Sequence, residues 1–161
     1  MSLLKKEWPD IIVDHLSEGI FDTAFEVRTV TGCPVVPSPV PGAHVRFSEY
    51  NENVPGKGSR HNVGLNGETR KADGTDLFLV RNSDARRFWK AAQQVESLGG
   101  FGIYFDTKLA GEPRVMFHLD RRPNRLLWVC PNTAHREYVY QPNGPLHFDA
   151  VLDREFARLE N

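Results

Sequence analysis

Apolar residues recur at helical spacing in three stretches of the chain. Between residues 10 and 30 they lie mostly three to five positions apart, which predicts a helix interrupted at Gly19. The same period runs through residues 85–98 and stops before Gly99, a residue type that favours helix termination. Residues 151–160 are expected to form a terminal helix.

Short apolar runs between polar turns predict β-strands. They occupy residues 44–47, 76–80, 101–105, 114–120 and 126–130. Prolines exclude a helix from residues 33–42 and leave an extended segment or an edge strand there. Because the helices and strands do not alternate and their links are mostly short, the order favours an α+β fold with an antiparallel sheet flanked by helices.

Composition and charge narrow the classes of function. At 161 residues the chain is expected to form a single domain. Its formal net charge is −1 and its basic residues form no long run, so we expect no nucleic-acid partner. No apolar stretch reaches the roughly 20 residues that span a bilayer, so we expect no membrane span.

The first residues lack a signal-peptide pattern, and Cys33 and Cys130 fit a reduced chain. We therefore expect a protein that is cytoplasmic as synthesised and reaches any external target by another route.

Residues 48–75 carry almost no periodic apolar signal. They are rich in Gly, Asn, Pro and charge, and a loop of this length in a compact domain is usually functional or disordered. Since the segment contains His61, we interpret it as a functional loop.

Two histidines and an aspartate from distant segments offer the ligands of a catalytic zinc site. His61 lies in the long loop, Asp76 begins a predicted strand, and His118 lies within another strand. Two imidazoles and one carboxylate leave the fourth position of a tetrahedral Zn²⁺ free, which distinguishes a catalytic site from a closed structural one. Such an ion activates water and polarises a carbonyl, so the implied chemistry is hydrolysis. Asp73 is the alternative carboxylate.

His118, Asp120 and Arg122 alternate along a predicted strand. Side chains two residues apart point to the same face, so these three could bind a metal, handle a proton and hold an anionic substrate group. The alternative is a surface strand with a charged face. His147 and Asp149 have the same spacing without comparable surroundings, and we interpret them as a surface pair. The other histidines are expected to be solvated or satisfied in the core: His15, His44 and His135.

Four motifs, in this order, resemble the zinc D-Ala-D-Ala carboxypeptidase family of the Hedgehog/DD-peptidase group. They are Arg46 and Asn51 before a glycine-rich loop that leads to Ser59-x-His61; Ala72-Asp73-Gly74-Thr75-Asp76; Gly99-Gly100-Phe101-Gly102-Ile103-Tyr104; and Phe117-His118-Leu119-Asp120-Arg121-Arg122, followed by Arg125 and Trp128. The resemblance covers about residues 20–130, the expected core of the domain, and leaves residues 131–161 as a C-terminal extension.

The resemblance implies a role for each residue of the site. The implied ligands of Zn²⁺ are His61, Asp76 and His118. Arg46 would contact the substrate carboxylate or the developing oxyanion, and Ser59 would hydrogen-bond behind a ligand. Asp120 is the candidate for proton handling or for orienting His118. Arg122 is the candidate for binding the substrate.

The implied activity is hydrolysis of peptidoglycan stem peptides near D-alanine by zinc-activated water. Such an enzyme would be a D-Ala-D-Ala carboxypeptidase or a related endopeptidase, for example in a phage endolysin. Residues 62–70 look like an insertion, and Val115 stands where some relatives carry an acidic base, so the base stays open. The alternatives are a non-catalytic metal-binding domain of the same fold that binds cell wall or a protein partner, and a peptidase or amidase acting on another small peptide. The oligomeric state also stays open.

Overall fold

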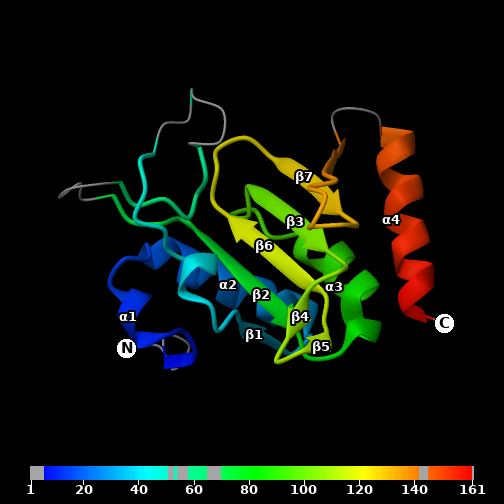
Figure 1. The fold of residues 1–161 in the computed structure, drawn as a ribbon, viewed down its shortest axis with the longest axis horizontal. Coiled ribbons are helices and arrows are strands. Elements are labelled where there is room, and N and C mark those ends of the chain that lie inside the picture. The colour runs from blue at the N-terminus through cyan, green and yellow to red at the C-terminus, as the bar shows by residue number, and fades with distance from the viewer. Residues whose placement is uncertain (1–5, 51–52, 54–57, 65–69, 142–144, 161) are drawn as a thin grey trace.

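A six-stranded sheet forms the centre of the computed structural model, which describes residues 6–50, 53, 58–64, 70–141 and 145–160 (Figure 1). In spatial order the strands are β1 (Val35–Pro37), β2 (Gly74–Leu79), β6 (Met116–Asp120), β3 (Gly100–Tyr104), β7 (Leu126–Cys130) and β8 (Val139–Tyr140). Neighbouring strands are antiparallel except β3 and β7, which run parallel. The α+β prediction is confirmed, and the sheet is mostly rather than wholly antiparallel.

The parallel pair arises because β6 and β7 lie on either side of β3. A small hairpin of β4 (Lys108–Leu109) and β5 (Glu112–Pro113) joins β3 to β6. The chain then passes the end of β3 before β7 begins. A Cβ atom at Gly99 would lie 1.8 Å from the backbone oxygen of Arg122, so only a glycine lets the connection pass this closely.

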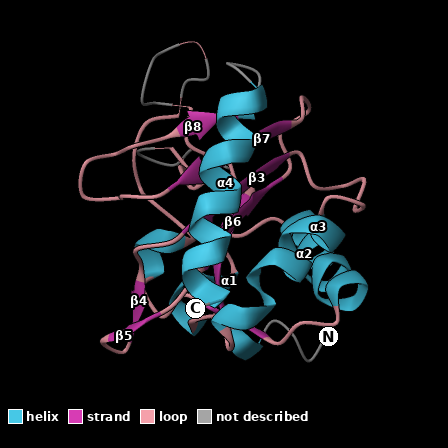
Figure 2. Ribbon diagram, turned by 90° about the vertical axis from the view of Figure 1, so that its right-hand side faces the viewer, coloured by secondary structure: helices cyan, strands magenta, loops and turns pink. Residues whose placement is uncertain are grey.

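Four helices surround the sheet among the described residues: α1 (Asp10–Val13), α2 (Glu18–Thr31), α3 (Ala85–Ala92) and α4 (Pro145–Glu160), with short 3₁₀ turns η2 (Pro41–Ala43) and η3 (Asn82–Asp84). Figures 1 and 2 place α2 and α3 together on one side of the sheet, while α4 runs beside β7 and β8. None of the described helices is both long and apolar enough to cross a bilayer.

The predicted interruption at Gly19 is wrong, because Gly19 lies inside α2. The break comes earlier, where Ser17 caps α2 by accepting a hydrogen bond from the backbone N–H of Ile20. Gly19 leaves space for the guanidinium of Arg121, which lies against the helix at this point. The helix ends at Gly32, whose φ of 59° is left-handed.

The predicted helix over residues 85–98 is also too long, since α3 ends at Ala92. Arg125 explains the early end. Its guanidinium donates hydrogen bonds to the carbonyl oxygens of Gln93, Val95 and Leu98, which satisfies groups that a continuing helix would have to pair. The apolar spacing continues because Val95 and Leu98 stay buried in the turns that follow.

Two further predictions concern extended segments. Within the proline-rich run, Val35–Pro37 forms the edge strand β1, one of the two predicted alternatives, and the end of the run enters the 3₁₀ turn η2, which the exclusion of a helix did not allow for. Residues 44–47 form no strand; η2 precedes them, and their pairing is a single parallel bridge between Arg46 and Asn62. The backbone groups of Arg46 bond to those of His61 and Val63, so this segment pairs with the long loop instead of the sheet.

Side chains along β3 and β6 point alternately to the two sides of the sheet, so one face packs into the core and the other is polar. Phe101 and Phe117 stack on each other, 5.4 Å between ring centroids, and Trp89 of α3 stacks on Phe101 at 4.6 Å. Phe148 of α4 lies 6.1 Å from Trp89. The segment after residue 130 thus adds a strand to the sheet and an aromatic ring to the core. The residues that alternate with these on β3 and β6 face the opposite side of the sheet, where the candidate site lies.

Candidate metal centre

A row of residues crosses the sheet on its polar face. Asp76 on β2 pairs with His118 on β6, His118 pairs with Gly102 on β3, and Gly102 pairs with Trp128 on β7. Trp128 in turn pairs with Tyr140 on β8. Because paired residues on neighbouring strands share a face, the register alone brings two of the predicted ligands side by side.

His61 reaches these two residues from the long loop, and all three side chains are buried. Nε2 of His61 lies 3.1 Å from Nδ1 of His118 and 3.6 Å from Oδ1 of Asp76, and that oxygen lies 2.9 Å from Nδ1 of His118. Ligands at about 2.0–2.1 Å from a tetrahedral zinc ion lie about 3.3 Å apart. The three atoms are therefore spaced as the corners of one face of a zinc tetrahedron, and this group could hold a metal ion.

The outer nitrogen of each ring contacts a hydrogen-bond acceptor. Nδ1 of His61 lies 3.2 Å from the backbone oxygen of His44, and Nε2 of His118 lies 3.0 Å from Oδ2 of Asp120. An outer N–H that donates to an acceptor leaves the lone pair of the inner nitrogen for a metal. The surrounding hydrogen bonds thus favour the tautomers in which both inner nitrogens can act as ligands.

A buried polar network supports His61 from behind. His44 is fully buried, with Nε2 at 2.7 Å from the backbone oxygen of Ser38 and Nδ1 at 2.7 Å from the hydroxyl oxygen of Thr75. Trp8 donates its indole N–H to the same hydroxyl at 3.0 Å. His44 is satisfied in the core, as predicted, and its carbonyl also orients a candidate ligand. Trp8 was not among the residues that the sequence indicated, and Thr75 stood within the second motif without a role of its own.

Burial and charge give the two histidines opposite proton affinities. Burial lowers the pKa of His61 to about 4, so this ring is neutral at physiological pH. Burial also acts to lower the pKa of His118, but hydrogen bonds to Asp120 and Asp76 outweigh it and raise that pKa to about 9. Without a metal, His118 is therefore an imidazolium between two carboxylates. A cation in the centre would take the place of its proton.

Asp73 does not join this group. Its Oδ1 accepts a hydrogen bond from the hydroxyl of Ser17 at 2.6 Å and lies 3.8 Å from the guanidinium of Arg121. Of the two candidate carboxylates, Asp76 therefore lies with His61 and His118. Asp76 is the third residue of β2 and not its first, because the strand begins at Gly74.

The expected insertion at residues 62–70 closes on itself at its base. Nε of Arg70 donates a hydrogen bond to the backbone oxygen of Asn62 at 3.0 Å. With its ends held together, the insertion leaves His61 and Asp76 close enough to share one ion. Residues 65–69, and Asn51 of the first motif, lie outside the described residues.

Asp120 lies behind His118 and has no exposed surface. Arg122 holds it with side-chain hydrogen bonds of 2.5–3.0 Å to both carboxylate oxygens. Burial acts to raise the pKa of Asp120, but the hydrogen bonds from His118 and Arg122 hold it far below the ordinary range. A Cβ at Gly100 would lie 2.4 Å from both carboxylate oxygens, so this glycine of the third motif makes room for Asp120.

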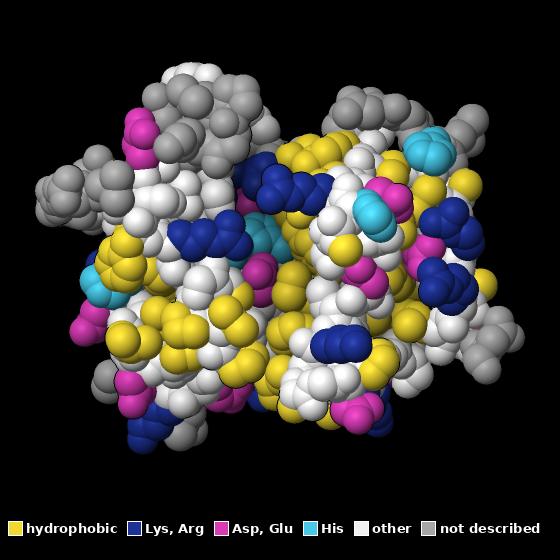
Figure 3. Space-filling model, in the orientation of Figure 1, with side chains coloured by type: hydrophobic (Ala, Val, Ile, Leu, Met, Phe, Trp, Pro, Cys, Tyr) yellow, Lys and Arg dark blue, Asp and Glu magenta, His cyan; other side chains and the backbone are white. Residues whose placement is uncertain are grey.

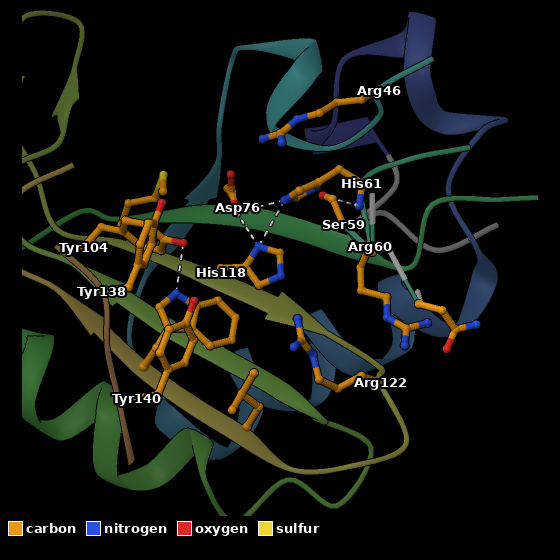
Figure 4. A pocket seen from close by; sticks show the side chains of 15 residues that line it. Arg46, Ser59, Arg60, His61, Asp76, Tyr104, His118, Arg122, Tyr138 and Tyr140 are labelled. Atoms are coloured by element: carbon orange, nitrogen blue, oxygen red, sulfur yellow. Dashed lines mark hydrogen bonds and ion pairs between the residues drawn. The ribbon is translucent and has the colours of Figure 1, made fainter. Parts of the chain in front are cut away.

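The metal group lies in a cleft of about 700 Å³ (Figures 3 and 4). The space-filling view shows basic and histidine side chains gathered in a hollow near the middle of this face. Arg46 lies on one side of the group and Arg122 on the other (Figure 4). Nε of Arg46 donates to the backbone oxygen of Gly42 at 2.8 Å, and the hydroxyl of Ser59 accepts from the backbone N–H of His61 at 3.4 Å.

A wall of aromatic side chains, which the sequence analysis missed, forms another side of the cleft. Its members are Tyr104, Trp128, Tyr138 and Tyr140. Tyr104 ends the third motif and Trp128 follows the fourth, but the sequence assigns no role to either residue. The short strand β8, with no periodic signal of its own, supplies Tyr140. The pairing of β8 with β7 places this tyrosine beside Trp128.

The remaining side chains singled out by the sequence lie away from the cleft. His135 and His147 are exposed, and the ring of His15 contacts that of Phe47. Both cysteines are buried free thiols, so no disulfide joins them. Val115 is buried and lines no part of the cleft.

Comparisons with models of known protein families, with curated proteins and with solved structures find no match to this chain. The resemblance carried by the motifs around His61, Asp76 and His118 therefore stays a prediction. The conclusion that the geometry supports is a coarser one. The chain is a mixed α+β protein with a buried His–Asp–His group that could hold a metal ion.

Proposed function

We propose that this chain is a zinc-dependent metallopeptidase of the Hedgehog/DD-peptidase group that hydrolyses peptidoglycan stem peptides near D-alanine. One observation carries the proposal. Two imidazole rings with their outer nitrogens on hydrogen-bond acceptors direct their inner nitrogens toward Oδ1 of Asp76, at separations that match a zinc tetrahedron. The cleft around them supplies room for a peptide and basic side chains for its carboxylate.

Three protein ligands leave one position of a tetrahedral ion for water and substrate, and zinc bound there would supply a lowered water pKa and a polarised carbonyl. In the overall reaction the amide C–N bond breaks and the oxygen of water joins the carbonyl carbon. The amine leaves with a proton from that water. The tasks that fall to the protein are to hold the substrate, stabilise negative charge on the carbonyl oxygen and keep the ligands oriented.

Arg46 and Arg122 are the two candidates for holding the substrate. Arg46 is exposed on the rim, and a guanidinium binds a carboxylate through two parallel N–H donors. Arg122 also lines the cleft, but it is paired with Asp120 and lies over the Trp128 ring at 5.3 Å. We assign the terminal carboxylate of the substrate to Arg46. In this proposal Arg122 mainly holds Asp120 in place.

Asp120 acts in this proposal as the residue that orients His118, and not as the base. Its depressed pKa makes it a poor proton acceptor, and it has no exposed surface. Among the described residues that line the cleft, Asp76 is the only carboxylate, and it is a proposed ligand. This observation favours the second candidate, a non-catalytic metal-binding domain that binds cell wall or a protein partner.

Turnover by the zinc-loaded protein separates the two candidates. Purified peptidoglycan fragments of several stem-peptide types are incubated with the protein, and released D-alanine and peptides are measured. We expect product from the wild type and none from His61→Ala or His118→Ala, which should also lose bound zinc. His147→Ala is the matched control, since this exposed histidine has the same spacing to an aspartate. A wild type that holds one zinc ion and releases nothing from any fragment would leave the binding domain as the better proposal.

A further inference from the structure

Tyr104 occupies the position on β3 that is diagonal to His118. Gly102 pairs with His118 across β3 and β6, so Tyr104 is the next residue on the same face. Diagonal neighbours of this kind lie about 7–8 Å apart, within reach of an aromatic side chain. Tyr104 is half-buried and lines the same cleft as the metal group. In Figure 4 it lies on the side of the metal group opposite Arg60 and Ser59.

The hydroxyl of Tyr104 is held by the indole of Trp128. Nε1 of Trp128 donates a hydrogen bond to this oxygen at 3.0 Å (Figure 4). The indole reaches it across Gly102, where a Cβ would lie 2.1 Å from the ring. Trp128 also packs against the His118 ring, with 5.2 Å between centroids. The position of the hydroxyl is therefore fixed relative to a proposed metal ligand.

The direction of this hydrogen bond determines what the hydroxyl can still do. An indole N–H can only donate, so the Tyr104 oxygen is the acceptor and its own proton stays available. The ring of Tyr138, a residue at the rim of the cleft that is 40% exposed, lies edge to face with the Tyr104 ring at 6.2 Å between centroids. Burial, together with the charge of Asp76, raises the pKa of Tyr104 far above its ordinary value. The group is therefore a neutral donor at every pH at which the protein would work.

We propose that Tyr104 is a catalytic residue of this site and donates its hydroxyl hydrogen bond to the carbonyl oxygen of the substrate as negative charge develops there. This inference rests on the proposed peptidase function and assigns it an oxyanion donor within the sheet. The proton that the Tyr104 hydroxyl does not use in its bond with Trp128 would point to the substrate oxygen. No proton is transferred by Tyr104, so the balance of the hydrolysis is unchanged.

Arg46 and Tyr104 then have separate tasks. Arg46 belongs to the irregular segment before the loop and is exposed, which suits capture of a flexible carboxylate. Tyr104 is fixed by a strand, by Trp128 and by burial, which suits stabilisation of charge at one point in space. A fixed neutral donor directed at the point where charge develops is the type of group that stabilises a transition state more than the ground state.

The test compares Tyr104→Phe with wild type, and Tyr50→Phe serves as the control because Tyr50 does not line the cleft. On the peptidoglycan fragment that the wild type cleaves, Tyr104→Phe should reduce kcat by about 100-fold or more and leave KM and the zinc content nearly unchanged. It should also weaken binding of a phosphinate analogue of D-Ala-D-Ala, which carries tetrahedral anionic oxygens. Binding of D-alanine should change far less.

The Trp128→Phe variant excludes a purely structural role. If the hydroxyl only satisfied the indole N–H, removing both partners would restore kcat, because neither group would be left unpaired. We expect no such restoration in the Tyr104→Phe, Trp128→Phe double variant. Restoration, or an unchanged kcat in Tyr104→Phe, would overturn the inference while the peptidase function stands. Absence of any turnover by wild type would instead overturn the proposed function and this inference with it.

Discussion

Oδ2 of Asp120 lies 3.0 Å from Nε2 of His118, on the side of the ring away from the candidate metal centre. The two residues are two positions apart on β6, so they share a face of the sheet. The carboxylate is fully buried and hydrogen-bonded to Arg122, which leaves it little freedom to move. A ring held in this way presents Nδ1 to the centre in one orientation, before any ion binds.

Asp120→Asn should weaken zinc binding by about 10- to 100-fold. The amide keeps the shape of the carboxylate but loses the charge that makes the histidine ring a stronger ligand. Zinc affinity is measured by competition with a chelator of known strength. Asp149→Asn is the matched control, since Asp149 is exposed and follows a histidine at the same spacing. Equal affinities for both variants would contradict the orienting role.

Asp76→Ala and Asp73→Ala should separate ligation from stability. Loss of Asp76 removes one of three ligands and should weaken zinc binding by more than about 100-fold. Loss of Asp73 breaks its hydrogen bond to Ser17, the cap of α2, and should cost about 1 kcal/mol of unfolding free energy with zinc affinity unchanged. Chelator competition and chemical denaturation of the metal-free protein measure the two effects. If Asp73→Ala were the variant that lost zinc, the ligand assignment would be wrong.

Zinc binding at pH 6 should release about one proton, and that proton should come from His118. With a pKa raised to about 9, His118 is protonated at this pH and must lose its proton to act as a ligand. With a pKa near 4, His61 is already neutral and contributes almost nothing. Zinc affinity should therefore fall as the pH decreases from about 9.

Calorimetric titrations in buffers of different ionisation enthalpy count the released protons. Asp120→Asn removes a negative charge that raises the pKa of His118, so its metal-free form should hold this proton less firmly and its zinc affinity should depend less on pH near neutrality. Release of no proton by the wild type at pH 6 would mean that His118 is neutral without metal.

Local pattern was sufficient for features that depend on one segment of the chain. The strand at Leu126–Cys130 has the predicted bounds, and the edge strand at Val35–Pro37 is one of the two alternatives that the prolines left open. The shared face of His118 and Asp120 also follows from the two-residue period of any strand. The two-residue period follows from backbone geometry, and the restriction on helix in the proline-rich run follows from the absence of an N–H in proline.

Predictions of helix limits failed where a residue from a distant part of the chain contacts the helix or the segment that follows it. The helix beginning at Ala85 ends early because Arg125, far along the chain, takes the carbonyl groups that follow it. Gly19 lies inside α2, where its lack of a side chain leaves space for Arg121. Neither Arg125 nor Arg121 alters the spacing of apolar residues from which the ends of the helices were predicted. A sequence pattern therefore located these elements but not their ends.

The sequence by itself determined the kinds of side chain available: two imidazoles, two competing carboxylates and a row of alternating polar residues on one strand. Only the tertiary structure decided between Asp73 and Asp76, brought His61 to them from an irregular loop, and placed Tyr104 beside His118. The physical reason is that contacts between distant residues depend on strand register and on hydrogen bonds such as those joining Arg46 to the segment at His61. No local period encodes these relationships, because each one is fixed by packing and pairing across the whole domain.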